Sequence, residues 1–155
     1  MAIHSELISL FTRDLRRVAQ EIEAFPTDES LWQTAPGVTN SAGNLALHLE
    51  GNLREYIGRQ LGGIAYTRQR PLEFSTTGLT RAEVAARIDA VRETIIPTLA
   101  TADLDALFPE NVLGQPLTTR QFVLHLLGHL NYHLGQIDYL RRMNTGDGAL
   151  KLAGL

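Results

Sequence analysis

Cysteine is absent from this 155-residue chain. The protein therefore has no disulfide, no thiolate metal ligand and no cysteine nucleophile, so a bound metal must use nitrogen or oxygen ligands. No apolar run approaches the roughly 18 to 20 residues needed to span a bilayer, and residues 1–6 lack the basic and apolar segments of a signal peptide. We therefore expect a cytoplasmic protein that does not enter a membrane.

Charge of one sign does not accumulate either. The net charge is −3, and no dense Lys/Arg face is present, so a nucleic-acid-binding surface is not indicated. The chain also lacks internal repeats, a heptad seam and low-complexity tracts. Its 44% hydrophobic and 20% charged residues are ordinary for a globular protein, and its length fits one domain spanning residues 1–155.

Four amphipathic segments predict helices, and no segment predicts a strand convincingly. The helices are expected over residues 5–25, 41–61, 80–99 and 118–143, with Pro97 kinking or ending the third. Ser41 is a candidate N-cap, and Thr80-x-x-Glu83 and Thr118-x-x-Gln121 are capping boxes. This pattern predicts an all-α four-helix bundle. The long connections indicate that at least one crosses over, making two sequential helices parallel.

The fourth helix carries a row of histidines in apolar surroundings. His125, His129 and His133 are spaced i, i+4, i+8, and Gln136 continues the stripe, which we expect to face the protein interior. His125 and His133 lie about 12 Å apart along the axis, too far to share one ion, so the pair is 125/129 or 129/133. We favour His129 and His133, because Gln136 and Asn131 lie near that end and could orient ligands. His125 then packs beside the site or supports it.

The second helix offers a third ligand. His48 shares its core-facing stripe with Asn52 and Tyr56, which become candidates for the surrounding pocket. If the second and fourth helices are neighbours, His48 can meet the histidine row inside the bundle. Three neutral imidazoles with open positions for water describe a catalytic rather than a closed structural metal site.

Glycines at positions 51, 58, 128 and 135 interrupt the predicted helices. Each costs about 1 kcal/mol relative to alanine, so each suggests a close approach of another group to the backbone. Close helix packing beside the site and a tight subunit contact would both explain them.

The chain resembles the DinB/YfiT-like superfamily of metal-binding four-helix bundles, in its uncharacterised DinB-like branch. The resemblance spans about residues 5–143 and rests on three segments: 43–57 with its single His48, 129–137 with its His-x3-His and Gly-Gln, and 68–74 between them.

The resemblance implies an up-down-down-up bundle and one divalent cation, nickel or zinc, held by His48, His129 and His133. It also implies a homodimer. Characterised relatives are transferases and isomerases that use low-molecular-weight thiols such as bacillithiol or mycothiol, and there the metal would activate the thiol as thiolate. Leu134 stands where thiol-using relatives often have a charged residue.

Three functions stay open at this point. The first is a metal-dependent thiol S-transferase acting on a small electrophile, and the second is a non-catalytic metal- or ligand-binding protein related to stress. The third is metal-dependent hydrolysis, which needs a carboxylate base beside the metal, and Glu50 points off the His48 stripe. A solvent-connected pocket with an open coordination position would favour an enzyme, and a sealed site would favour the binding protein.

The fourth helix is apolar on more than its histidine side, at Leu124, Leu127, Leu134 and Tyr139. Such a helix must be covered on more than one face. A second copy of the chain could cover part of it, as in a homodimer, and the alternative is that the first helix and the long loops cover it completely.

Overall fold

The structure is a computed structural model, and it describes residues 2–151. Within that range the chain forms helices and no strand, as the sequence predicts. The only pairing of strand type is an isolated bridge between Leu107 and Thr118. The helical elements are α1 (Ala2–Glu23), η1 (Ser30–Trp32), α2 (Ala42–Leu53), η2 (Arg54–Leu61), α3 (Arg70–Ser75), α4 (Arg81–Thr101) and α5 (Thr119–Thr145).

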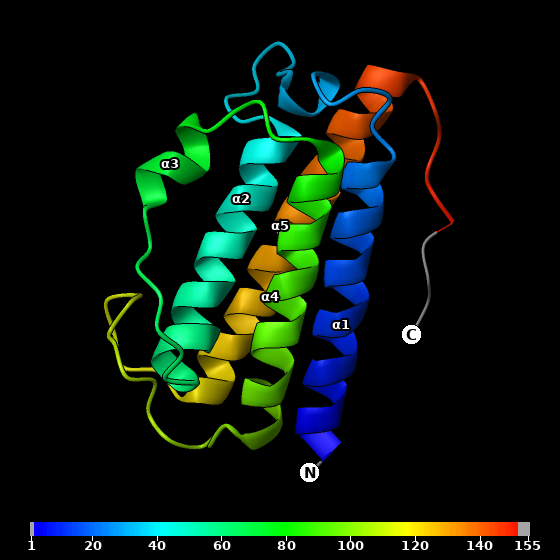
Figure 1. Cartoon of the computed structure of the whole chain (residues 1–155). Coiled ribbons are helices and arrows are strands. Elements are labelled where there is room, and N and C mark those ends of the chain that lie inside the picture. The colour runs from blue at the N-terminus through cyan, green and yellow to red at the C-terminus, as the bar shows by residue number, and fades with distance from the viewer. Residues whose placement is uncertain (1, 152–155) are drawn as a thin grey trace.

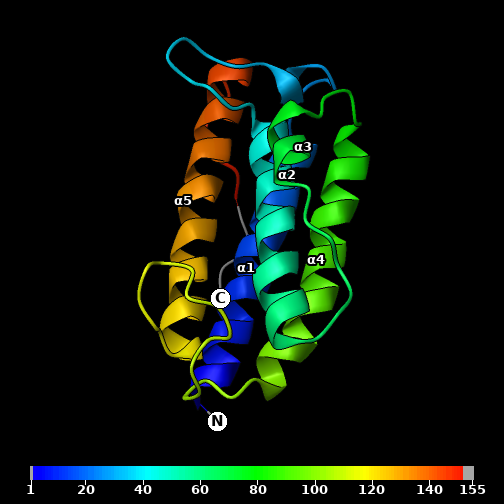
Figure 2. The ribbon, with the colours of Figure 1, turned by 90° about the vertical axis from the view of Figure 1, so that its left-hand side faces the viewer.

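The long helices α1, α2, α4 and α5 lie side by side as a bundle (Figure 1). Helix α2 begins at the end of the bundle where α1 finishes. The connection 62–80 returns to that end, so that α4 runs in the same direction as α2, and α5 runs back. This connection carries α3, which lies on the outside of α2 (Figure 2). Helix α1 packs most extensively against α4, and α2 packs against α3 and α5.

The core follows the apolar periodicity of the sequence. The predicted stripe of α4 is buried along its whole length, and so is most of that of α1, because each presents one apolar side to the other helices. The side chains that are at most 1% exposed include Leu7, Phe11, Leu15, Val18 and Ile22 of α1 and Val84, Ile88, Val91, Ile95 and Leu99 of α4.

The starts of α2, α4 and α5 are as the sequence predicts, whereas α1 begins at Ala2, before the expected residue 5. The Ser41 side chain accepts a hydrogen bond from the Asn44 amide, and both capping boxes form at Thr80 and Thr118. Pro97 does not end its helix, because α4 continues to Thr101. The bond that proline removes would have used the carbonyl of Glu93, an exposed residue where water can satisfy the carbonyl.

Two elements differ from the expected pattern. The second helix reaches Leu61 as predicted, but its last part, η2, is a π-helix, in which the Gly62 amide bonds to the Ile57 carbonyl. Helix α3 lies in a segment expected to be an irregular polar connection. Its proline lies in the first turn, where a missing N–H costs nothing.

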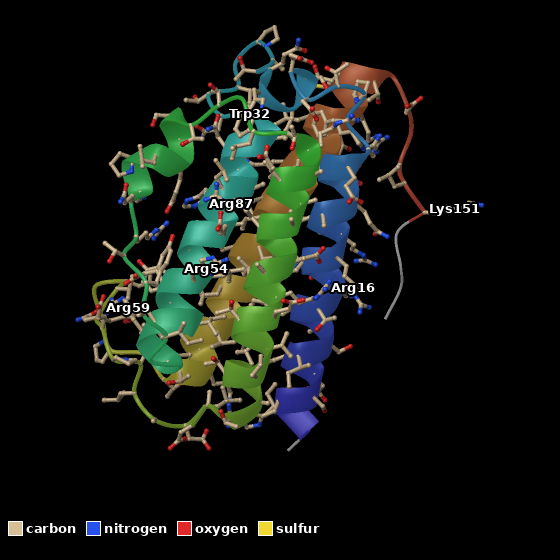
Figure 3. All side chains as sticks on the ribbon, viewed as in Figure 1. Arg16, Trp32, Arg54, Arg59, Arg87 and Lys151 are labelled. Atoms are coloured by element: carbon tan, nitrogen blue, oxygen red, sulfur yellow. The ribbon has the colours of Figure 1, made fainter. Side chains whose placement is uncertain are left out.

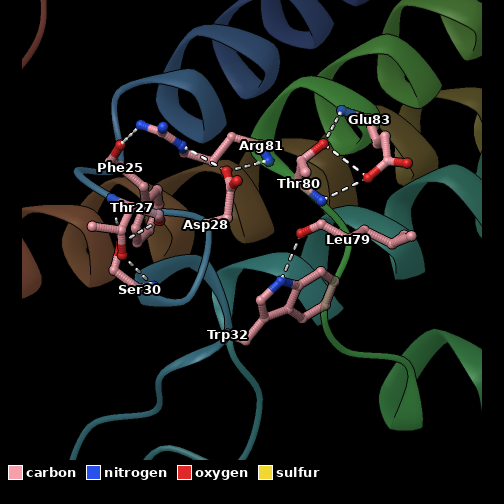
Figure 4. A network of polar contacts seen from close by, with 9 residues as sticks. All are labelled: Phe25, Thr27, Asp28, Ser30, Trp32, Leu79, Thr80, Arg81 and Glu83. Atoms are coloured by element: carbon pink, nitrogen blue, oxygen red, sulfur yellow. Dashed lines mark hydrogen bonds and ion pairs between the residues drawn. The ribbon is translucent and has the colours of Figure 1, made fainter.

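Polar contacts tie the α1–α2 connection to the start of α4 (Figure 4). Asp28 Oδ1 accepts from both the backbone N–H and the Nε of Arg81, each at 2.9 Å, and Arg81 also donates to the Phe25 carbonyl. Trp32 Nε1 donates to the Leu79 carbonyl at 2.9 Å. These bonds hold the ends of three helices in a defined relation, which α2 needs if its side chains are to meet those of α5.

Two polar pairs connect α1 with α5, and the second of them is fully buried. Asn131 Nδ2 donates to Asp14 Oδ2 at 2.8 Å, and Arg141 forms a fully buried ion pair with Glu21. A buried pair of this kind adds little net stability, but a slip of the helices would leave its charges unpaired. The two contacts therefore hold α5 in register against α1. Among the described residues, no helix has both the length and the apolar character needed to cross a membrane.

Candidate metal centre

Three imidazole nitrogens converge between α2 and α5. His129 Nε2 lies 3.2 Å from His48 Nε2 and 3.1 Å from His133 Nε2, and one nitrogen of each ring lies within 4.8 Å of the other two. Metal–nitrogen bonds of about 2.0–2.1 Å at angles between about 90° and 109° place ligand nitrogens about 3.0–3.4 Å apart. Two of the three separations therefore fit ligands of one cation, and the third, between His48 and His133, lies within 4.8 Å. The cluster uses the pair 129/133 rather than 125/129.

The protonation of two of these rings is determined by their other nitrogens. His48 Nδ1 donates to Glu73 Oε2 at 2.9 Å, and His133 Nδ1 donates to Gln136 Oε1 at 2.7 Å. Because both acceptors are oxygens without a proton to give, each Nδ1 carries the hydrogen and each Nε2 presents a lone pair. Three imidazole nitrogens that meet this closely, two of them with lone pairs, form a donor set that fits a metal.

The third ring belongs to His129, whose Nδ1 is buried without a hydrogen-bond partner among residues 2–151. Burial, together with the neighbouring His133 and His48, lowers the pKa of His129 to about 4. Burial also lowers the pKa of His133, although its bond to Gln136 opposes this. Both imidazoles are thus neutral at pH 7, which is the form that binds a metal.

Glu73 of α3 orients His48 and is itself held by Arg68. The guanidinium donates from Nε to Glu73 Oε1 at 2.7 Å and from Nη2 to Oε2 at 2.9 Å. Burial alone would raise the pKa of Glu73, but the hydrogen bonds from His48 and Arg68 outweigh it and hold the pKa below its usual value. An ionised carboxylate on a ligand imidazole fixes its orientation and increases its basicity.

Hydrogen bonds from the Asn44 side chain to backbone carbonyls hold α3 close to α2. Asn44 Nδ2 donates to the carbonyls of Glu73 (3.1 Å) and Thr76 (2.9 Å). At Gly51 a Cβ would lie 2.1 Å from Glu73 Oε1, so only glycine lets the carboxylate come this near α2. The ring of Phe74 lies 5.0 Å from that of His48. One short helix therefore supplies both the acceptor of His48 and an aromatic cover over it.

The sequence profile of the DinB superfamily matches residues 10–137. The chain belongs to the DinB superfamily. A crystal structure of a DinB-like protein from Bacillus cereus superposes with a TM-score of 0.70 at 20% sequence identity, covering 93% of this chain and 95% of the other. At that identity the likeness shows the shared fold. No curated protein matches the sequence.

In this DinB-superfamily fold, two residues of α5 do not lie where the sequence interpretation put them. Asn131 bonds to Asp14 and to the Leu127 carbonyl, on the α1 side, so its expected role beside the ligands is wrong. It is two residues from both His129 and His133, a rotation of about 200° on a helix. His125 is exposed rather than facing the interior, and its ring stacks on Phe122 with centroids 5.8 Å apart.

The pocket candidates Asn52 of α2 and Tyr56 of η2 follow His48 along the second helix. Asn52, one turn further along, is buried, and its Oδ1 has no hydrogen-bond partner in the described part of the chain. The half-buried Tyr56 packs edge-on against Phe122, with ring centroids 5.2 Å apart, and the Arg68 guanidinium lies 5.8 Å from its ring centre.

The sequence interpretation did not assign Glu73, Arg68 or Phe74 to the site. The signal that pointed to them was Gly51, a glycine in a buried helix that the approach of Glu73 explains. Of the other helix glycines, Gly58 would meet Thr94 at 3.4 Å, whereas a Cβ at Gly128 or Gly135 would meet nothing within 4 Å. Those two glycines therefore face open space and not a neighbouring helix.

A hollow of about 470 Å³ adjoins the triad on the side of His133. It lies between the connection 37–40 and the C-terminal half of α5, and both His133 and Gln136 form part of its wall. Its rim includes Tyr132, Tyr139 and Met143, which are exposed to solvent. The hollow is therefore an open space next to one of the three histidines.

Proposed function

We propose that this protein is a metal-dependent enzyme, with one divalent cation, zinc or nickel, held by His48, His129 and His133. The observation that supports this most directly is the convergence of three Nε2 atoms, two of them left with lone pairs by bonds at Nδ1. Held there, the cation would act as a Lewis acid that lowers the pKa of a low-molecular-weight thiol, so that the thiolate attacks a small electrophile.

The chain's own groups hold and orient the ligands. Arg68 keeps Glu73 ionised and in place, and Glu73 keeps the proton of His48 on Nδ1, away from the triad. Gln136 does the same for His133.

The surroundings of the triad support an enzyme over a sealed, non-catalytic binding protein. His129 and His133 are only partly buried, and the hollow beside His133 opens to solvent. A site that only stores or senses an ion would gain from being closed. A substrate needs this kind of access.

Hydrolysis has less support, because the nearby carboxylates are occupied. Glu50 bonds to Arg54 and Arg87, both labelled in Figure 3, at 3.2 and 2.7 Å. Glu73 is bonded to His48 and Arg68. Among the described residues, no carboxylate joins the three histidines as a further ligand-type group, so none stands ready as a general base. Thiol transfer does not need one.

The test begins with the metal content of purified protein. Zinc-loaded protein is then incubated with 1-chloro-2,4-dinitrobenzene and, in turn, bacillithiol, mycothiol and glutathione. In this reaction sulfur bonds to the ring carbon, chloride leaves with the electron pair, and the thiol proton goes to buffer. We expect the protein to accelerate the reaction of at least one of these thiols. The acceleration should be lost in His48→Ala and kept in His125→Ala. Protein that binds zinc but accelerates none of these reactions would favour the binding protein, and protein that binds no metal would overturn the proposal.

Two finer features accompany the proposal. The helix directions visible in Figure 1 support the up-down-down-up order of the long helices. We also propose a homodimer formed over the first half of α5, where Leu124 is exposed and Gly128 faces open space. Leu134 does not contribute to such a surface, because it is buried in the core of its own chain.

A further inference from the structure

We propose that the hollow beside His133 binds an uncharged, apolar group of the substrate, an alkyl chain or a ring of about six carbons. The inference rests on the proposed function, since it takes the neighbouring triad as the reacting centre. It adds the class of substrate: a small molecule with one polar, metal-directed end and one apolar end.

The wall of the hollow is mainly apolar. The buried Leu45 and Leu140 line its inner side, and the exposed Val38, Tyr132, Tyr139 and Met143 surround its mouth. Its polar contributions come from neutral groups, including those of residues 39, 40, 133 and 136, and no Asp, Glu, Lys or Arg side chain lines it. A volume of about 470 Å³ lies in the range of small-molecule pockets.

The nearest charges are already paired. The Arg142 guanidinium lies 5.1 Å from the centre of the Tyr139 ring, and it bonds to Asp138 at 3.5 Å. A charged substituent entering the hollow would lose its hydration and gain no opposite charge in return. An apolar substituent has no favourable hydration of this kind to lose.

The exposure at the mouth points the same way. Tyr132, Tyr139 and Met143 are 65%, 62% and 58% exposed, although each has a large apolar surface. A concavity surrounded by large exposed apolar side chains is more often a binding site than an ordinary part of the surface is. The opposite side of the site differs, because a hollow of about 410 Å³ there is lined by Glu55, Arg59, Arg68 and Glu110.

The hollow is continuous with the triad through two residues. His133 contributes Nε2 to the triad and its ring to the wall, and Gln136 both accepts from His133 Nδ1 and lines the hollow. A molecule whose polar end reaches the triad can therefore extend its other end along α5, past Tyr139 toward Met143.

The test uses hydroxamates, whose polar end binds zinc, on zinc-loaded protein by isothermal titration calorimetry. Acetohydroxamate reports the triad alone, and hexanohydroxamate adds four methylenes. Each buried methylene should improve Kd about fourfold, and about 200-fold is expected if all four enter the hollow. Adipic monohydroxamate, with a carboxylate at the far end, should lose most of this gain.

Variants locate the effect. Tyr139→Ser with Met143→Ser should reduce the hexanohydroxamate gain at least tenfold and leave acetohydroxamate binding unchanged. Leu113→Ser, also an exposed apolar residue but outside the hollow, is the matched control and should change neither.

The outcomes separate the two proposals. If acetohydroxamate and zinc both fail to bind, the proposed function fails. If acetohydroxamate binds and hexanohydroxamate binds no better, the pocket inference fails while the metal site stands. An equal loss of the gain in Leu113→Ser would also overturn the inference.

Discussion

Replacing Gly51 by alanine tests whether Glu73 lies where the structure places it. The new Cβ would lie 2.1 Å from Glu73 Oε1 and 2.7 Å from its Cδ. An ordinary contact between such atoms is about 3.5 Å, so the carboxylate must move by more than about 1 Å. A shift of that size breaks the 2.9 Å bond to His48 Nδ1 and disturbs the two bonds from Arg68.

Two opposing contributions to the free energy of unfolding give the expected change in stability. Alanine is better than glycine inside a helix by about 1 kcal/mol, while the loss of a buried hydrogen bond to a charged group costs about 1.5–3 kcal/mol. Metal-free Gly51→Ala should therefore be less stable by about 0.5–2 kcal/mol. Loss of the partner that orients a ligand imidazole should lower zinc affinity by about 10- to 100-fold.

The assays are thermal unfolding of metal-free protein and zinc competition against a chromophoric chelator. Gly135→Ala is the matched control: it is also a helix glycine, but its Cβ would meet nothing within 4 Å. It should raise Tm and leave zinc affinity unchanged. If Gly51→Ala behaves like this control, the position of the carboxylate is wrong. In a Glu73→Ala background, Gly51→Ala should cost no further affinity, because the group it displaces is gone.

Four other predictions concern the metal, the stability of the metal-free protein and the assembly. Replacing His48, His129 or His133 by alanine should abolish stoichiometric zinc, measured by elemental analysis after dialysis, and His125→Ala should not; zinc loss in the His125 variant alone would shift the site by one turn. A site of three histidines with ordinary pKa values would bind zinc about a thousandfold more weakly at pH 5.5 than at pH 7.5. The lowered pKa values of His129 and His133 keep those rings neutral over this range, so competition titration should show a smaller loss of zinc affinity. The same lowered pKa values mean that the unfolded chain takes up protons first, so urea titrations should show metal-free protein losing stability as the pH falls from about 6.5 towards 4; a flat profile would contradict them. Sedimentation equilibrium at micromolar concentration should give twice the chain mass of 17.1 kDa for the proposed homodimer, and a clean monomer would rule it out.

The helices and their core faces could be predicted from the sequence, because they depend on local periodicity and local hydrogen bonds. The α4 stripe and the capping boxes at Thr80 and Thr118 are as expected. The proximity of His129 and His133 is also local, since residues four apart on a helix always share a face. Pro97 shows the limit of such rules: a helix passes through it where the freed carbonyl lies at an exposed residue.

The rest of the site depends on contacts between residues far apart in the chain. His48 meets His129 across 81 positions, and Glu73 reaches His48 from a connection that has no long amphipathic pattern of its own. Periodicity indicates which face of a helix is buried, but it does not indicate which element covers that face. For this reason the sequence by itself determined the bundle helices and two of the three imidazoles, whereas the packing of α3 and α5 against α2 decided the third imidazole, its carboxylate partner and the hollow beside them.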